Sequence, residues 1–439
     1  MAFELSQKTL SEMSKALTAA SASGQALQPE DLEPQLVEEL RRLQPLTALI
    51  PVTQANGRIH EIARRTAHGA AAFEGELVSN VAGAVQSSYD RPTVTLKIAH
   101  FWGAVSGPQQ AASRRFIDSL QSEINGALEG MSNLIEFGTL WGDDADPYVF
   151  DGYDAQIRTN IHDQNGVVTL TLLDDIIDAA TAFRGTNRDP AMFIVSKKMV
   201  SKVSGLQTLA RKTVQTVEFE GGLRMDLYRG YPLYESDYVR PTATAPAGFT
   251  ATPAAGGTIP DGTYNYRIAS VRETGEQVAA ASDAAVLAGG NNISALAWTA
   301  DPDALLYKVF RTDAGGAAGT EYLYTTIAAK TRDSDGKITG NVATFNDSAP
   351  LTRPANAANE KPLDAGDECI FFTNVSTVDG RGASIVSLLD PLGVPTANLV
   401  SYIELARTRA TMDFMLQSML ALQLPFEKLH GKARRVTLT

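Results

Sequence analysis

Cysteine is almost absent from this chain of 439 residues. Cys369 is the single cysteine, which excludes an internal disulfide and any zinc site built on clustered cysteines. We expect Cys369 to be a small buried apolar residue, as unpaired cysteines usually are. The five histidines are scattered, without an H-E-x-x-H motif or a close pair, so we predict no metal site and no cofactor.

Positive charge and long apolar runs are also scarce. The chain has 38 Lys and Arg against 50 Asp and Glu, a net charge of -12, which argues against a protein whose main task is to neutralise phosphates. No window approaches the ~18 apolar residues of a membrane span. The first residues, "MAFELSQKTLSEMSKAL", lack the apolar core of a signal peptide, so we expect no classical export and no membrane partner.

Sequence signatures of catalysis are missing. There is no G-x-S-x-G elbow, and Cys369 lacks the local signature of a nucleophile. The stretch "HFWGAVSGPQQAASRRFIDSL" (100–120) has the strand, glycine turn and helix of a phosphate cradle. However, Gly103 and Gly107 have the wrong spacing, no Lys follows, and Pro108 removes a backbone amide. We interpret this stretch as a joint between a strand and a helix, and we expect no enzymatic activity and no catalytic residue.

Two acidic clusters are the remaining candidates for a metal site. They are "GDDADP" (142–147) and "DSDGK" (333–337). Neither is followed by the bidentate Glu that a calcium loop requires at a fixed distance. Because Asp side chains commonly accept hydrogen bonds from their own backbone in turns, we interpret both clusters as turns.

The composition and the hydrophobic pattern change along the chain. Residues 1 to about 45 have the pattern of an amphipathic arm with little to bury against itself. Between residues 56 and 107, apolar Val94, Leu96 and Ile98 alternate with polar residues, which is typical of strands. About fifty residues with so few bulky apolar side chains cannot build their own core. We therefore expect this extended hairpin to lie on another surface.

Helices and further strands follow. An apolar stripe after Pro108 predicts one helix of roughly 30 residues, running to about residue 138. Residues 169–183 predict a shorter helix, and residues 192–195 a buried strand that is followed by a helix from Ser196. Period-two alternation over residues 412–424 predicts a long strand with one buried face.

A different composition, rich in Ala, Thr, Pro and Gly, begins at Pro241 and continues to about residue 355. About seven short alternating runs lie inside it, among them "TYNYRIASV" and "LYKVFRT", together with Trp298. This is the pattern of a small β-sandwich, and we predict an independent domain inserted into the chain.

Two basic pairs, Arg64-Arg65 and Arg114-Arg115, could form a nucleic-acid patch. Acidic residues are interleaved with them, which favours ion pairs across a subunit contact instead. These acidic residues are Glu61, Glu74, Glu76 and Asp118.

The order of the segments resembles the major capsid proteins of tailed bacteriophages, which have the Johnson fold. The resemblance covers residues of about 50–240 and 360–439, and it rests on the order of several motifs. They are "AAFEGE" (71–76) and "TVTLKIAHFWGAVSG" (93–107) for an extended loop returning into a spine helix, "FDGYDAQI" (150–157) and "DPAMFIVSKKMVSKVSGL" (189–206) for the segment after it and an axial domain, and "LYRGYPLYESDYV" (227–239) for a hydrophobic hairpin.

The resemblance implies an α+β fold of the Johnson type with an all-β sandwich insertion. The implied parts are an N-terminal arm (1–52), an extended loop (53–107), a peripheral domain with the spine helix (108–185 and 396–439), an axial domain (186–240 and 356–395) and the inserted immunoglobulin-like or fibronectin-like domain (241–355). The candidate inter-subunit contacts are Arg64, Arg65, Phe73, Glu74, Glu76, Arg114 and Arg115.

The implied function is that of a major capsid protein in the virion, assembled in the host bacterial cytoplasm. Its copies would form hexamers and pentamers that close into an icosahedral head around double-stranded DNA, which they enclose without sequence recognition. Portal, scaffolding and decoration proteins are the implied partners. Residues 58–96 contain no Lys for a covalent link between subunits, so we expect a non-covalent shell. We also expect the inserted domain to project outward on its linkers.

Two alternatives from other classes remain. The first is a tail or decoration protein of the virion that carries a host-attachment domain. The second is a secreted carbohydrate-active enzyme with an accessory fibronectin-like domain, which would need a pair of catalytic carboxylates in a cleft. The spacing of the acidic residues nominates no such pair.

Overall fold

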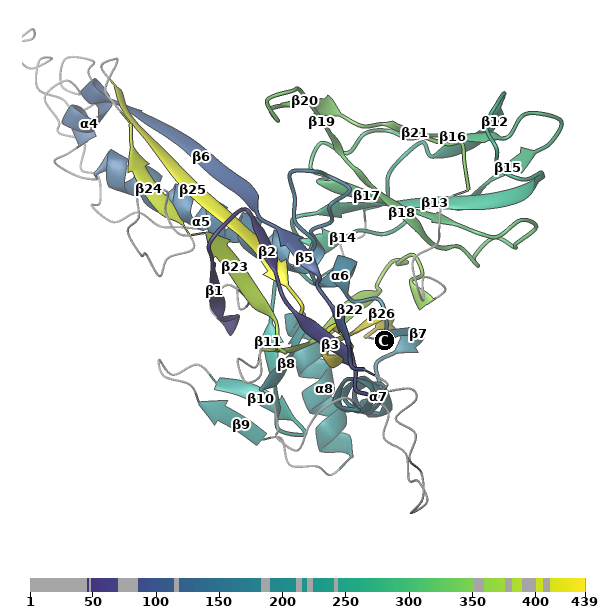
Figure 1. Cartoon of the computed structure of the whole chain (residues 1–439), viewed down its shortest axis with the longest axis horizontal. Coiled ribbons are helices and arrows are strands. Elements are labelled where there is room, and N and C mark those ends of the chain that lie inside the picture. The colour runs from purple at the N-terminus through teal and green to yellow at the C-terminus, as the bar shows by residue number, and fades with distance from the viewer. Residues whose placement is uncertain are drawn as a thin grey trace, which may run out of the picture.

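The computed structural model describes a mixed α+β molecule, which confirms the predicted fold class (Figure 1). It has a long sheet backed by a helix, a second sheet covered by two helices, and a unit of two further sheets (Figure 1). The described residues are 46, 49–69, 86–113, 118–182, 190–210, 215–218, 224–240, 244–350, 359–375, 381–388, 400–405 and 411–438.

A seven-stranded sheet in the order β7-β26-β22-β8-β11-β10-β9 forms the lower body in Figure 1. Helices α7 and α8 pack on it, and their apolar residues share one buried cluster with strands β8, β22 and β26. The bounds are β7 Ile161–Val167, α7 Leu170–Thr181, β8 Ala191–Val195, α8 Lys197–Leu209, β9 Gln215–Glu218, β10 Arg224–Tyr228, β11 Tyr231–Glu235, β22 Glu368–Asn374 and β26 Gly431–Thr437.

Two helices of this body begin as the sequence predicts. The Thr169 side chain accepts a hydrogen bond from the backbone N–H of Leu172 and so caps α7. The Ser196 side chain accepts from the N–H of Met199 and caps α8. Strand β8 before it is buried along its whole length. These three predictions are confirmed.

The second large sheet has the order β1-β23-β25-β24, with β6 paired to β25 as well. Strand β25 is 13 residues long, which confirms the predicted long strand. Strand β6 runs antiparallel to it from the Ser106–Thr411 pair to the Lys97–Leu420 pair. Helix α5 packs on one face, against Phe101 of β6 and Phe414 of β25. The bounds are β1 Val52–Ala55, β6 Lys97–Ser106, α4 Gly107–Ser113, α5 Ser119–Trp141, α6 Tyr153–Gln156, β23 Ser384–Leu388, β24 Ser401–Glu404, β25 Thr411–Gln423 and the 3-10 helix η3 Glu427–Leu429.

The prediction of one helix from residue 108 is wrong. The structure has two helices, α4 and α5, and Asp118 caps the second one. The Asp118 backbone is extended (φ -73°, ψ 100°), and its side chain accepts from the N–H groups of Leu120 and Gln121. A residue that caps a helix has a non-helical backbone, so Asp118 interrupts the helix at this one position. The apolar spacing continues across this break and therefore hides it in the sequence.

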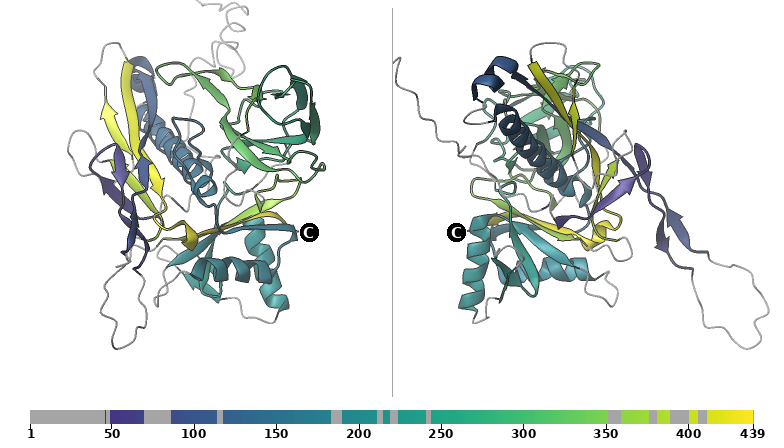
Figure 2. Two further views of the ribbon diagram at one scale, coloured as in Figure 1. Left: turned by 45° about the vertical axis from the view of Figure 1, so that its right-hand side comes forward. Right: turned by 90° about the vertical axis from the view of Figure 1, so that its left-hand side faces the viewer.

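An extended ribbon leaves the body at one edge (Figure 2, right). It consists of the antiparallel pairs β2 with β5 and β3 with β4. The long extended hairpin that the sequence predicts is thus present in its described part, while residues 70–85 lie outside it. The bounds are β2 Ile59–Glu61, β3 Arg64–Ala67, β4 Ser88–Asp90 and β5 Thr93–Thr95.

Two sheets and a small hairpin make up the inserted unit, at the upper right of Figure 1. The sheets β12-β16-β21 and β14-β13-β17-β18, with β15 beside β13, share one core in which the Trp298 ring meets Tyr307 edge-on. Its classification as immunoglobulin-like or fibronectin-like stays a prediction. The bounds are β12 Thr250–Ala254, β13 Gly262–Arg272, β14 Gly275–Glu276, β15 Asp283–Leu287, β16 Ile293–Ala297, β17 Leu306–Arg311, β18 Tyr322–Ala328, β19 Lys330–Arg332, β20 Ile338–Asn341 and β21 Thr344–Asp347.

The sheets cut across the predicted segments of the peripheral and axial domains. Strand β26 pairs with β7 on one side and β22 on the other, and β22 pairs with β8. The seven-stranded sheet therefore takes strands from both predicted domains. The division into the two domains stays a prediction, but its boundaries at residues 185 and 396 do not follow the sheets.

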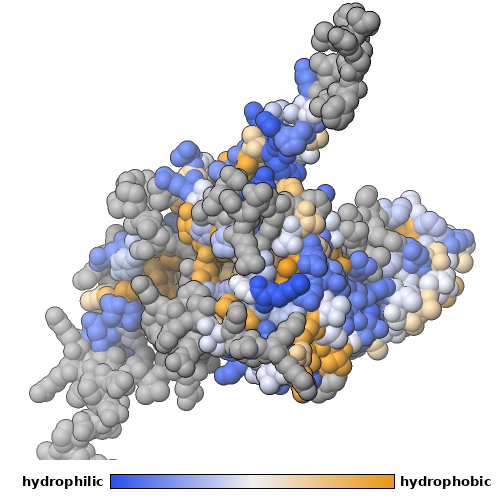
Figure 3. All heavy atoms as spheres, turned by 90° about the horizontal axis from the view of Figure 1, so that it is seen from below, coloured by the Kyte–Doolittle hydropathy of each residue, from blue (hydrophilic) through white to orange (hydrophobic). Residues whose placement is uncertain are grey.

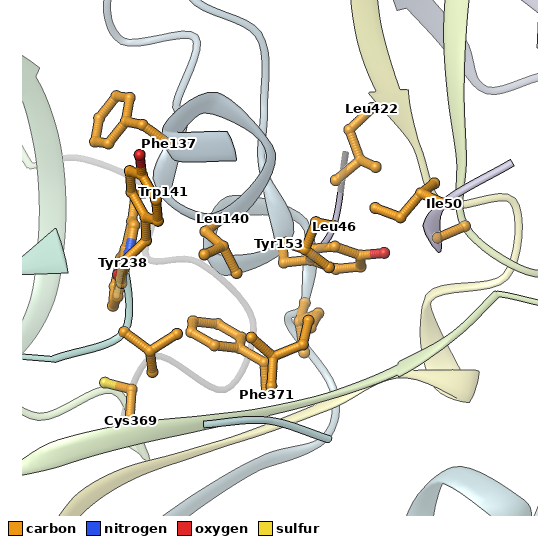
Figure 4. Close-up of a cluster of buried hydrophobic side chains, with 14 of the residues drawn as sticks. Leu46, Ile50, Phe137, Leu140, Trp141, Tyr153, Tyr238, Cys369, Phe371 and Leu422 are labelled. Carbon is orange, nitrogen blue, oxygen red and sulfur yellow. The ribbon is translucent and has the colours of Figure 1, made fainter. Parts of the chain in front are cut away.

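One apolar core lies where the helix end, the seven-stranded sheet and the inserted unit meet (Figure 4). The Trp141 ring at the end of α5 contacts Phe371 of β22 edge-on at 5.4 Å, and its indole N–H donates to the Tyr238 carbonyl at 2.6 Å. Cys369 lies in the same cluster, as a buried apolar residue should, and burial raises the pKa of its thiol to about 12. The inserted unit contributes Val271 and Leu306 to this core.

Replacement of Gly103 by Val tests the packing of β6. A Cβ atom at this glycine would lie 2.2 Å from Cζ of the buried Phe414 ring, so the larger side chain forces the ring out of place. We expect Gly103→Val to lower the free energy of unfolding by about 1–3 kcal/mol in chemical denaturation. The control is Ala104→Val on the exposed face of the same strand, which should be close to neutral. Equal effects of both substitutions would contradict the packing argument.

Candidate functional site

The basic residues predicted as subunit contacts have partners within the chain. Arg64 on β3 forms an ion pair with Asp90 of β4 at 2.7 Å and also donates to the Pro425 carbonyl at 3.2 Å. Arg65 donates to the Tyr89 hydroxyl at 3.1 Å and lies 5.4 Å from the centre of that ring. Neither partner is one of the predicted acidic residues, and both contacts lie within the ribbon, where they join β3 to β4. A contact of these residues with a neighbouring subunit stays a prediction.

The other predicted contact residues lie outside the described part of the chain. Their prediction as contact residues therefore stays a prediction. They are Phe73, Glu74, Glu76, Arg114 and Arg115.

An uncovered apolar surface lies on the long sheet, on the side facing away from α5. On β6, Ile98 and Trp102 are 42% and 62% exposed, and His100 between them meets the Trp102 ring edge-on at 6.2 Å. The cross-strand partner of Trp102 on β25 is Met415, which in turn pairs with Ile403 of β24. We call this row of apolar residues the outer face of the long sheet.

Large exposed apolar side chains also occur on the extended ribbon. Ile59 on β2 and Tyr89 on β4 are 62% and 64% exposed. Contiguous exposed apolar residues on a soluble protein typically mark a contact with another molecule. Figure 3 shows hydrophobic residues on the surface of the body, whereas the inserted unit on the right is mostly hydrophilic.

Two consecutive aromatic residues in the sequence indicate this surface. Phe101 and Trp102 are consecutive, so in a strand their side chains must point to opposite faces. A strand with a large aromatic residue on each face is suited to a sheet that is covered on both sides. In the described part of the chain, α5 covers only one of these faces, and β6 has only β25 as a strand partner.

Six buried charged side chains meet between the inserted unit and the body. Lys308 of β17 contacts Asp154 of α6 and lies 2.7 Å from Glu276 of β14. From β26, Arg434 lies 2.6 Å from Glu276. Lys432, also on β26, lies 2.9 Å from Glu360 and 3.1 Å from Asp154, and it completes the set. We call these residues the charge cluster.

The charge cluster is balanced, with three cations and three carboxylates. Burial by itself would raise the pKa of Asp154, but Lys308, Lys432 and Arg434 hold it well below its usual range. Burial likewise opposes the charge of Lys308, but Asp154 and Glu276 raise its pKa. Because the carboxylate pKa is lowered in the folded state, the resulting stability is present above about pH 4 and is lost as the pH falls further.

The charge cluster joins the inserted unit to the body, and a second contact supports it. Arg332 of β19 forms an ion pair with Asp146 at 2.9 Å, and its guanidinium lies 4.9 Å from the centre of the Tyr148 ring. The expectation of an independent unit on linkers is therefore incomplete, because the unit shares buried charges and apolar core with the body. In the sequence, the position of Lys308 within the apolar run "LYKVFR" indicated a buried charge, and hence a contact of this strand with another part of the chain. Whether the unit faces outward in a shell stays a prediction.

The two acidic clusters form turns, as predicted. The Asp143 carboxylate accepts from the Ala145 N–H at 3.0 Å, and Asp333 accepts from the N–H groups of Asp335 and Lys337. The first cluster also gathers a residue that the sequence analysis missed. Carboxylate oxygens of Asp143, Asp144 and Asp151 lie within 4.8 Å of one another. Burial, together with the two neighbouring carboxylates, raises the pKa of Asp151 to about 6.

Among the described residues, no helix combines the length and the apolar character that crossing a membrane requires.

Replacement of Lys308 by Met tests the charge cluster. The substitution leaves the three carboxylates of the charge cluster buried with only two cations, and we expect it to lower the free energy of unfolding by about 3–5 kcal/mol in chemical denaturation. The control is Lys330→Met on β19, whose amine donates to the exposed Asn341 side chain and should matter by about 1 kcal/mol or less. A similar small loss for both variants would show that the charge cluster does not hold the two parts together.

Comparisons with known proteins show which folds this structure is similar to. No protein-family model and no curated protein matches the chain. The SrpI encapsulin of Synechococcus elongatus PCC 7942, solved as a holo complex, is 11% identical with a TM-score of 0.53 and covers 96% of this chain and 98% of its own. The capsid of a native GTA particle is 10% identical with a TM-score of 0.50 and covers 96% and 99%. At such low identities the likeness concerns the fold, and the chain has the Johnson fold of encapsulins and phage capsids.

Proposed function

We propose that the chain is a major capsid protein whose copies assemble into a closed shell. The observation that carries this proposal is the outer face of the long sheet, where Ile98 and Trp102 are exposed among the described residues. Trp102 is 62% exposed, so covering it removes about 90–150 Å² from water, which at about 25 cal/mol per Å² contributes about 2–4 kcal/mol per copy. Repeated in every subunit, such contacts favour assembly.

The finer features of the proposal rest on charge and composition. The copies form hexamers and pentamers of an icosahedral phage head, and double-stranded DNA is enclosed without sequence recognition. The net charge of -12 suits a wall that does not bind the DNA tightly. The absence of Lys from residues 58–96 supports a non-covalent shell. The location is then the virion, with assembly in the host cytoplasm and portal, scaffolding and decoration proteins as partners.

A second candidate function is a shell that holds no DNA. The likenesses to the SrpI encapsulin and to the GTA capsid, with TM-scores of 0.53 and 0.50, support the same fold for both functions and leave the contents of the shell open to measurement. The two functions share the assembly contacts and differ in their contents. Nucleic acid that survives nuclease treatment of purified particles supports the phage head, and particles without it support the second function.

Electron microscopy of the protein, expressed alone and with its neighbouring genes, tests assembly. We expect closed polyhedral shells from the wild type and unassembled subunits from Trp102→Glu, since a charge on the outer face cannot be buried without a partner. The control is Ile338→Glu, which alters a 50% exposed apolar residue on β20 of the inserted unit and should leave the shells intact.

One further measurement shows whether the Trp102→Glu subunit is folded. Circular dichroism should show Trp102→Glu as folded as the wild type, because the side chain is 62% exposed in the subunit. Normal shells from Trp102→Glu would refute the role of the outer face. Tubes, or a monomer under every condition, from the wild type would refute the shell and return attention to a tail protein.

A further inference from the structure

Helices α7 and α8 carry opposite charges. Both pack on the face of the seven-stranded sheet that contains Phe193 and Phe372, in the lower body of Figure 1. The sequence of α7, "LTLLDDIIDAAT", has three aspartates and no basic residue, whereas that of α8, "KKMVSKVSGLQTL", has three lysines and no acidic residue. The same side of the sheet therefore presents an acidic helix and a basic helix to solvent.

The outward side of α8 has no partner within the described part of the chain. Its residues follow one another at helical spacing and are Lys198, Lys202, Gly205 and Leu209. Leu209 is 82% exposed, the largest fraction of any large apolar side chain among the described residues. Neither lysine forms an ion pair with a described carboxylate, although Lys198 lowers the pKa of the buried Glu368 from a distance. A basic stripe that ends in an exposed leucine is suited to a contact with another molecule.

The outward side of α7 has the same spacing with the opposite charge. Its residues are Thr171, Asp175, Asp178 and Ala182, and both aspartates are exposed. Arg229 lies 3.2 Å from Asp174 and 3.6 Å from Asp178, so one cation faces the three aspartates of the helix. The surface of α7 therefore keeps a net negative charge.

The two outward sides match when the helices lie parallel. Asp175 is then opposite Lys202, because each is the second member of its stripe. The last members, Ala182 and Leu209, are also opposite each other, so the leucine packs on a small residue. A close approach is open at Gly205, since no atom lies within 4 Å of a Cβ atom built there.

A second copy is required for this pairing. Within one chain, both helices bury their apolar sides on the sheet, so their outward sides point away from it and cannot face each other. The phosphate backbone of a nucleic acid would suit the lysines, but the neighbouring acidic helix repels a polyanion, and Leu209 gains nothing from phosphates. The acidic α7 of another copy accounts for both the lysines and the leucine.

We propose that α7 of one copy docks on α8 of a neighbouring copy, with Asp175 against Lys202 and Ala182 under Leu209. The proposal rests on the proposed function, because a shell holds copies side by side. This contact is separate from the outer face of the long sheet. Complementary charge adds specificity for the correct neighbour, and it makes assembly sensitive to salt.

Charge exchange in the full-length protein tests the contact. Lys202→Glu and Asp175→Lys each place like charges opposite one another, and each should raise the protein concentration for half-assembly about tenfold or more in light scattering. The variant with both substitutions again has opposite charges and should assemble within about threefold of the wild type. The control is Lys337→Glu, the same charge change at an exposed site of the inserted unit, which should assemble like the wild type.

Paired cysteines locate the contact directly. Cys369 is buried, so cysteines introduced at the surface react without it. Ala182→Cys together with Leu209→Cys should give disulfides between copies on oxidation, visible as crosslinked chains on denaturing gels. Ile338→Cys together with Leu209→Cys is the control and should stay uncrosslinked.

The outcomes separate this contact from the proposed function. Wild-type shells that assemble equally well after both charge reversals would overturn the contact and leave the shell intact, as would shells whose paired cysteines do not crosslink. Lys202→Glu particles that assemble normally but lose nucleic acid would overturn it in favour of phosphate binding by α8. A wild type that is monomeric under every condition would refute the proposed function and the contact together.

Discussion

Burial of six charges between the inserted unit and the body is the constraint on which the arrangement of the protein depends. A buried ion is costly unless its partners are in place, so Glu276 and Lys308 can leave water only when Asp154, Glu360 and β26 are correctly positioned. The apolar core beside the charge cluster is less demanding, because apolar side chains tolerate many neighbours. Charge balance therefore specifies how the two parts dock, and apolar burial contributes most of the driving force.

The long sheet provides the surface through which copies can meet. Its inner face is filled by α5, while its outer face presents Trp102 and Ile98 to solvent. The inserted unit docks near the end of α5 and leaves this outer face open. The unit and the proposed assembly surface thus occupy different parts of the molecule, and a shell can form with the unit in place.

Local patterns in the sequence predicted local structure well. The alternation in β25, the caps Thr169 and Ser196 and the buried strand β8 could all be identified because each depends on a few neighbouring residues. The break at Asp118 was missed because the apolar stripe continues through it. The charge cluster and the meeting of Asp151 with Asp143 and Asp144 could not be predicted, because they depend on how distant segments pack. The Johnson fold was predicted from the order of motifs and not from any one of them.

The distances along the chain within the charge cluster bear on how the protein folds. Lys308 and Asp154 are 154 positions apart, and Lys432 and Asp154 are 278 positions apart. Contacts of such separation form late, because closing long loops costs entropy before any contact is gained. The two sheets of the inserted unit can form early from neighbouring strands, but their charged edge stays hydrated until β26 arrives. Docking of the inserted unit therefore requires that β26, which carries Lys432 and Arg434, is in place within the seven-stranded sheet.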